Sequence, residues 1–190
     1  MGDDRRPGPW EVVRDEDKGD FEVFRVRALH ARSPQDGSVQ AFHVAQAPDG
    51  VAVLALTDTD ELVMVQQWRH PVQCVTLELP AGIVEEGEAP GDAAARELRE
   101  ETGYAGGEPV CIGSLIINPS WTTARLHVVV VRGVRRAGEK ELDEGEDTRV
   151  CCVPLAAARR RVLSGEIDTA PSVAALALYD LWRADARDGA

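Results

Sequence analysis

Strand-like runs on both sides of one helical segment constrain the fold of this 190-residue chain more than any other feature. Residues 51–68 contain two apolar runs around a short polar turn, which is the pattern of a β-hairpin. Residues 126–134 are dominated by valine, whose branched side chain favours strands. Between them, residues 90–101 are rich in Ala, Arg, Glu and Leu, which are good helix formers. This order predicts a mixed α/β (α+β) layered domain.

The composition divides the chain into three parts. Residues 1–19 are mostly polar or charged, and we expect them to form a flexible N-terminal arm. Residues 20–50 carry further strand signals and predict an antiparallel β region. Residues 51–190 are predicted to form the main domain. It ends with two predicted helices, near residues 155–163 and 171–184.

Acidic residues outnumber basic residues by 33 to 21, which leaves a net charge of −12. Such a charge argues against binding to nucleic acid, which needs a basic surface, and against docking on an anionic membrane. The excess is local, because seven acids and two arginines fall in residues 82–103 and six acids and one lysine in residues 139–147. Segments that gather carboxylates in this way suit divalent cations.

The cysteines and the N-terminal residues indicate a compartment. No apolar targeting segment is visible, and no run approaches the roughly 20 apolar residues of a membrane span. Cys151 and Cys152 are adjacent, which is a poor geometry for a disulfide, and Cys74 and Cys111 form no CxxC pair. Because each cysteine has a valine neighbour, we expect buried, reduced thiols and a cytoplasmic protein.

Three glutamates share one face of the helix predicted over residues 90–101. At about 100° per residue, Glu97, Glu100 and Glu101 lie within an arc of about 100°. Their charges repel one another, and the last turn of a helix also disfavours negative charge. Cations would neutralise this face, and ligands that are all oxygen suit Mg²⁺ or Mn²⁺. A solvated charged face is the alternative interpretation of these glutamates alone.

The wider pattern around the glutamates favours a metal site. The segment 82–104 fits G-x5-E-x7-R-E-U-x-E-E-x-G-U, where U is a bulky apolar or aromatic residue. The matching residues are Gly82, Glu88, Arg96, Glu97, Leu98, Glu100, Glu101, Gly103 and Tyr104. This is the Nudix box, so the chain resembles the Nudix hydrolases, which cleave a nucleoside diphosphate linked to another moiety. The resemblance implies a mixed β-sheet sandwiched between helices.

The resemblance also implies roles for individual residues. Arg96 would orient a carboxylate, that of Glu88, through a bidentate hydrogen-bonded pair. Arg96 and Glu100 would take part in catalysis, and Ile83 would contact the substrate. The implied ligands of Mg²⁺, with Mn²⁺ as the alternative ion, are the Ala81 carbonyl, Glu97, Glu100, Glu101 and Glu146. Clustered metal ions neutralise phosphate charge and activate water, which diphosphate hydrolysis requires.

Several segments outside the box resemble the ADP-ribose pyrophosphatase branch of the family. Residues 66–72, QQWRHPV, are similar to its QxRxP stretch, and residues 77–82, LELPAG, to its ELPAG. Residues 165–178 are similar to the segment that enters its C-terminal helix. The substrate-binding residues implied by this resemblance are Arg69, Asn118, Pro119, Ser120 and Trp121. Arg69 would clamp phosphate oxygens, with a structural or surface role as the alternative.

The acidic segment 139–147 resembles the glutamate-rich loop of that branch. By this resemblance Glu144 would be the general base and Glu146 a metal ligand, with Glu141 or Asp143 as substitutes. A solvated acidic turn is the alternative interpretation.

The loop after Pro119 departs from the branch, because Ala124 replaces an acid and Trp121 is bulky. Trp121 either stacks on a base or sugar or packs within the fold.

The residues and the resemblance together predict an Mg²⁺-dependent pyrophosphohydrolase. The predicted substrate is ADP-ribose or a related nucleoside diphosphate sugar, cleaved to a nucleoside monophosphate and a sugar phosphate. The alternatives are another substrate, such as a GDP-mannose-like sugar nucleotide or a nucleoside triphosphate, or a non-catalytic nucleotide sensor. Because residues 20–50 resemble a part that helps form the dimer in this branch, we expect a homodimer.

Overall fold

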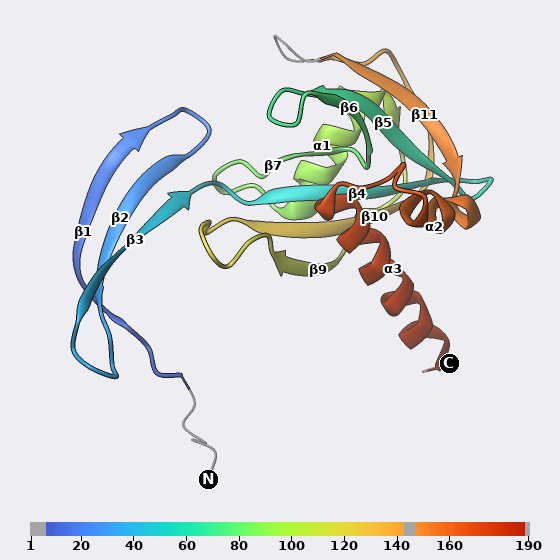
Figure 1. Ribbon diagram of the computed structural model, residues 1–190. Helices are drawn as coiled ribbons and strands as arrows, with labels where there is room; N and C mark the ends of the chain where they lie inside the picture. The colour runs from blue at the N-terminus through green and yellow to red at the C-terminus, as the bar shows by residue number, and fades with distance from the viewer. Residues whose placement is uncertain (1–6, 143–146, 189–190) are drawn as a thin grey trace. The chain divides into compact units, whose positions relative to one another are not determined.

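The computed structural model describes residues 7–142 and 147–188, which form two units shown in Figure 1. Among the described residues, one unit comprises residues 7–48 and 116–124, and the other residues 49–115, 125–142 and 147–188. The first boundary falls close to the predicted one, but residues 116–124 were expected in the main domain. They join the N-terminal unit because Ala45 N donates to Trp121 O at 2.7 Å and Thr123 N donates to Ala45 O at 3.1 Å.

The described part of the N-terminal unit is a three-stranded antiparallel sheet in the order β1-β2-β3. The strands are β1 (Glu11–Asp20), β2 (Arg25–Arg32) and β3 (Val39–Gln46). The expectation of a flexible arm up to residue 19 is wrong from Glu11 onward, since β1 pairs with β2 along its length. Nearly all side chains of β1 are exposed, so its sequence lacks the apolar alternation that would reveal a strand.

Within the described residues, the main unit contains an eight-stranded mixed sheet in the order β11-β5-β4-β10-β8, with β6, β7 and β9 paired to β5, β4 and β10. The strands are β4 (Gly50–Thr57), β5 (Glu61–Arg69), β6 (Cys74–Glu78), β7 (Ala81–Ile83), β8 (Tyr104–Ala105), β9 (Val110–Ile116), β10 (Arg125–Arg136) and β11 (Thr148–Pro154). β4 and β10 pair in parallel, whereas β5 pairs antiparallel with β4, β6 and β11. The sequence patterns missed β7 and β8, which are too short to show a period.

The central strand β4 separates two apolar cores. Because successive side chains of a strand point to opposite faces, Val51 and Val53 join one core and Ala52 and Leu54 the other. The first core packs against α1 (Pro90–Thr102), and the second against α2 (Leu155–Leu163) and α3 (Ala170–Asp188). The predicted mixed sheet between helices is therefore confirmed, as the main unit in Figure 1 shows.

All four cysteines are free thiols, but the expectation that they are buried is wrong: Cys74, Cys111 and Cys152 are exposed, and Cys151 is half-buried. Cys152 is exposed because it alternates along β11 with the buried Val153. Cys74 and Cys111 are exposed on β6 and β9, each of which pairs with a single neighbour among the described strands. None of the helices in the described residues is long and apolar enough to span a membrane.

Candidate active site

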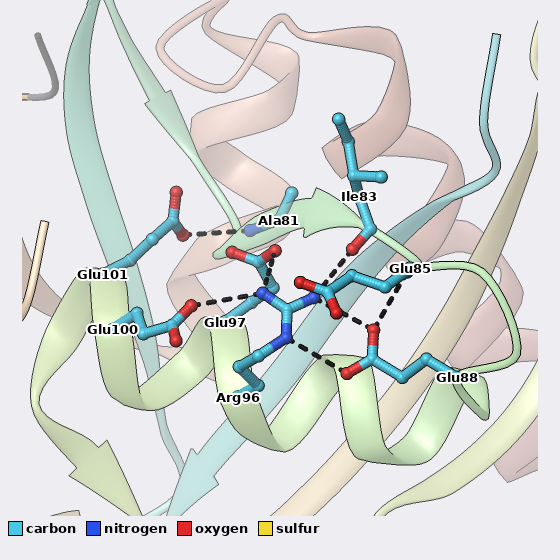
Figure 2. Close-up of polar contacts among 8 residues, drawn as sticks. All are labelled: Ala81, Ile83, Glu85, Glu88, Arg96, Glu97, Glu100 and Glu101. Atoms are coloured by element: carbon cyan, nitrogen blue, oxygen red, sulfur yellow. Dashed lines mark hydrogen bonds and ion pairs between the residues drawn. The ribbon is translucent and has the colours of Figure 1, made fainter. Parts of the chain in front are cut away.

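The glutamates of α1 face the short strand β7 (Figure 2). Glu101 is only 4% exposed, and its carboxylate accepts a hydrogen bond from Ala81 N at 3.0 Å. The Glu97 carboxylate lies directly over Gly82, since a Cβ atom added there would come within 1.9 Å of Glu97 Cδ. A side chain at the first position of the box would therefore displace the Glu97 carboxylate, which occupies that space.

Arg96 connects the remaining acids of the box (Figure 2). Its Nε and Nη2 donate to the two carboxylate oxygens of Glu88, both at 3.0 Å, which is the bidentate pair that the resemblance implied. Its Nη1 donates to Glu97 at 2.8 Å and to Glu100 at 3.2 Å, and Nη2 also donates to Ile83 O at 2.8 Å. The hydrogen bonds with Glu88 raise the pKa of Arg96 and lower the pKa of Glu88. One guanidinium thus compensates the like charges that gather on this face.

The donors on this face fit a hard divalent cation. They are oxygen atoms, from Glu97, Glu100 and Glu101, and they lie beside a strand whose Gly82 brings no side chain into the space. The carboxylates of Glu97 and Glu100 accept hydrogen bonds from Arg96. In the described residues, no group of three or more His, Cys, Asp or Glu side chains is arranged around one ion position. The chemistry of the donor set, rather than an existing ligand geometry, supports the fit.

A family model of the NUDIX domain matches residues 47–176. The chain belongs to the Nudix hydrolase family. It is 35% identical over 150 residues to the ADP-ribose pyrophosphatase of Bacillus subtilis (strain 168). The aligned residues cover 78% of this chain and 81% of that protein. It is 33% identical over 167 residues to the ADP-ribose pyrophosphatase of Mycobacterium tuberculosis, covering 87% of this chain and 80% of that protein.

A solved structure shares the Nudix fold. The crystal structure of an ADP compounds hydrolase superimposes with a TM-score of 0.82 and covers 94% of this chain and 96% of that chain. Its sequence identity to this chain is 21%. Nudix hydrolases generally use a divalent metal ion, which agrees with the oxygen donors on α1.

Glu141 in the acidic segment and Thr148, the residue that follows this segment, are both hydrogen-bonded to the last turn of α1. Glu141 N donates to Glu100 O at 2.8 Å, and Thr148 Oγ1 donates to Glu101 O at 3.2 Å. These bonds satisfy carbonyl groups that the end of a helix leaves without partners. The side chain of Glu141, one of the two substitutes named above, is exposed and pairs with Arg99 at 3.3 Å. Three predicted residues lie outside the described part of the chain: the general base Glu144, the metal ligand Glu146 and the second substitute Asp143.

Arg69 has a partner that the sequence analysis missed. Its Nε and Nη2 donate to the Glu78 carboxylate at 2.8 and 2.9 Å, and Glu78 is only 7% exposed. Burial by itself would raise the pKa of Glu78, but the hydrogen bonds from Arg69 and Thr76 outweigh it and hold this pKa below its ordinary value. The Nudix segment that precedes the box therefore contains a charge pair between neighbouring strands β5 and β6.

The proposed substrate residues 118–121 form a turn in the other unit. The side-chain oxygen of Asn118 accepts a hydrogen bond from Ser120 N at 3.0 Å, and the backbone carbonyl of Asn118 accepts one from Trp121 N at 3.4 Å. Pro119 lies between Asn118 and Ser120 in the chain. Trp121 is 54% exposed, which disfavours the interpretation that it packs within the fold. Ala124, where the branch carries an acid, is buried, and a carboxylate there would be costly without a partner.

The Arg69–Glu78 pair predicts an acid-sensitive part of the stability. Because the pKa of Glu78 is lowered by folding, its contribution is complete above the unfolded value of about 4.5 and is lost as the pH falls through the folded value. Glu78→Gln should lower the free energy of unfolding by about 1–3 kcal/mol at neutral pH, and the difference from the wild type should shrink below about pH 4. Urea unfolding at several pH values measures this difference.

The matched control is Glu139→Gln, whose side chain is 89% exposed in its pair with Arg136. This control should change the unfolding free energy by less than about 0.5 kcal/mol at any pH. If the difference in unfolding free energy between Glu78→Gln and the wild type stays constant from neutral to acidic pH, the stabilising role of the ionised pair is contradicted.

Proposed function

We propose that this Nudix hydrolase cleaves the diphosphate of ADP-ribose or a related nucleoside diphosphate sugar, releasing a nucleoside monophosphate and a sugar phosphate. The observation that carries the proposal is the face of α1 on which Glu97 and Glu101 meet β7 and Arg96 compensates the acids. The full-length similarity to two proteins named ADP-ribose pyrophosphatase supports the substrate. Another sugar nucleotide, such as a GDP-mannose-like compound, and a nucleoside triphosphate are the alternative substrates.

The proposed cofactor is Mg²⁺, with Mn²⁺ as the alternative. Glu97, Glu100, Glu101 and the Ala81 carbonyl would hold it, together with Glu146. When bound, such an ion neutralises charge on the diphosphate oxygens. The donor chemistry described above and the general use of divalent metal in the family support this assignment.

The chain's own residues would carry the remaining steps. Glu144 would take a proton from the attacking water, whose oxygen then bonds to one phosphorus while the bridging P–O bond breaks. Arg96 would keep the box carboxylates in place through its bonds to Glu88, Glu97 and Glu100. The proposed substrate contacts are those of Ile83, Arg69 and the turn 118–121, and Ile83 is already fixed through its carbonyl by Arg96.

A nucleotide panel tests the substrate. Purified protein with Mg²⁺ should release AMP from ADP-ribose faster than it releases products from GDP-mannose or a nucleoside triphosphate. Indifference to every ADP- and GDP-sugar would contradict the proposal.

Glu101→Gln tests the metal assignment. The amide keeps an oxygen that can accept from Ala81 N, so the fold should persist, but the charge that attracts the cation is gone. We expect kcat for ADP-ribose with Mg²⁺ to fall by much more than about tenfold. The control is Glu108→Gln, an exposed glutamate outside the box, which should keep the wild-type rate. Turnover of Glu101→Gln within about tenfold of the wild type would exclude Glu101 as a ligand.

Gly82→Ala tests the position of the Glu97 carboxylate. The new methyl group overlaps only the end of a flexible side chain, so folding should survive while the carboxylate is displaced. We expect activity to fall by about a hundredfold, the effect of misplacing a reacting group by about 1 Å. Gly138→Ala is the control, because a Cβ atom there meets nothing within 4 Å. Wild-type activity of Gly82→Ala would show that the position of Glu97 does not matter.

We also propose that the protein is a cytoplasmic homodimer. The free cysteines support the compartment. The N-terminal unit supports the dimer, because its sheet carries an apolar hollow of about 390 Å³ lined by Trp10, Val12, Leu29, Ala31 and Phe42. Light scattering should give twice the chain mass of 20.6 kDa, and Phe42→Asp should shift the protein toward monomer. A wild-type monomer at micromolar concentration would contradict the proposed dimer.

A further inference from the structure

The segment 165–178 takes no part in the chemistry proposed above, yet its Ser172 reaches the strand end that precedes the box. Ser172 lies in the first turn of α3 and is 2% exposed. Its Oγ accepts a hydrogen bond from Leu79 N at 3.1 Å, across 93 residues of sequence. Thr169 Oγ1 in turn donates to Ser172 Oγ at 3.0 Å. The C-terminal helix is therefore bonded directly to the backbone two residues before Ala81.

The Leu79 amide needs a partner from outside the sheet. β6 ends at Glu78, and Leu79 itself is 1% exposed, so water does not replace the lost ladder bond. Pro80, the next residue, carries no N–H with which the ladder could continue. A buried N–H without a partner is costly, and the Ser172 hydroxyl supplies the partner.

The segment of residues 79–81 between β6 and β7 is hydrogen-bonded to three other elements. Leu79 N is bonded to α3 through Ser172, and Pro80 O accepts from Val53 N of β4 at 2.8 Å. Ala81 N donates to the Glu101 carboxylate of α1 at 3.0 Å. A displacement of this segment would therefore move the Ala81 backbone, that is, both its carbonyl and the N–H that donates to Glu101.

We propose that Ser172 is a positioning residue of the metal site. It fixes the segment 79–81 and, through that segment, the Ala81 carbonyl and the Glu101 carboxylate, both of which the proposed function assigns to the divalent cation. The inference rests on that proposed function. Groups that orient metal ligands through hydrogen bonds commonly change metal affinity by about 10- to 100-fold when they are removed.

Ser172→Ala tests this role. Alanine is the best helix former, so the substitution removes the hydroxyl without weakening α3. Two measurements on the metal-free protein are needed: hydrogen exchange of the Leu79 amide, and the dissociation constant of added Mn²⁺ by electron paramagnetic resonance. We expect faster exchange at Leu79 and a dissociation constant raised by about tenfold or more. Ser172→Thr, which keeps the hydroxyl, should bind Mn²⁺ more tightly than Ser172→Ala.

Two further variants separate the hydrogen bond from general destabilisation. Ser164→Ala removes an exposed hydroxyl that donates to Arg161 O at the end of α2, and it should bind Mn²⁺ like the wild type. Thr169→Val leaves the Ser172 hydroxyl in place and removes only the hydrogen bond that Thr169 Oγ1 donates to it. The affinity for Mn²⁺ should therefore fall by about fivefold. If Ser172→Ala does not fold, as shown by circular dichroism, Thr169→Val carries the test.

The outcomes distinguish this inference from the proposed function. Glu101→Gln should bind Mn²⁺ far more weakly than the wild type. If it does, but Ser172→Ala and Thr169→Val bind within about twofold of the wild type, the positioning role is overturned and the metal site stands. If Glu101→Gln binds as tightly as the wild type, the metal site and the role of Ser172 are both overturned. Equal losses in Ser172→Ala and Ser164→Ala would also overturn the positioning role.

Discussion

The guanidinium of Arg96 is the interaction on which the arrangement of the box depends. It donates to Glu88, Glu97 and Glu100 and to the carbonyl of Ile83. Without it, the carboxylates of Glu88, Glu97 and Glu100 would repel one another, and Glu100 lies in the last turn of α1, where the helix dipole disfavours negative charge. The raised pKa of Arg96 and the lowered pKa of Glu88 express the same mutual stabilisation. The charge that makes the site suitable for a cation is therefore compatible with a stable fold.

The sheet places this helix and the C-terminal helix on opposite faces, and both are hydrogen-bonded to the segment 79–81. The cores on the two sides of β4 hold α1 and α3 in place. On one side, the Glu101 carboxylate of α1 accepts a hydrogen bond from Ala81 N. On the other side, the Ser172 hydroxyl of α3 accepts one from Leu79 N. The backbone beside the box is thus part of both layers, which explains how a segment near the end of the chain bears on a site near its middle.

Much of the fold was predictable because apolar periodicity and helix propensity are local properties. The hairpin of β4 and β5, the valine-rich β10 and the helix α1 follow from them directly. β1 was missed because an exposed, charged strand is held by ladder bonds and cross-strand pairs such as Arg27–Asp15 rather than by burial. The grouping of residues 116–124 with the N-terminal unit could not be predicted, because their bonds to β3 join positions far apart in sequence.

By itself the sequence determined which residues form the box, because the spacing of Glu97, Glu100 and Glu101 on a helix follows from helix geometry alone. It also indicated the Arg96–Glu88 pair through the resemblance. Only the tertiary structure decided that Arg69 pairs with Glu78, that Gly82 lies under Glu97 and that Ser172 bonds to Leu79. Hydrogen-bond partners of this kind depend on how the chain returns upon itself, and no local pattern of residues encodes that path.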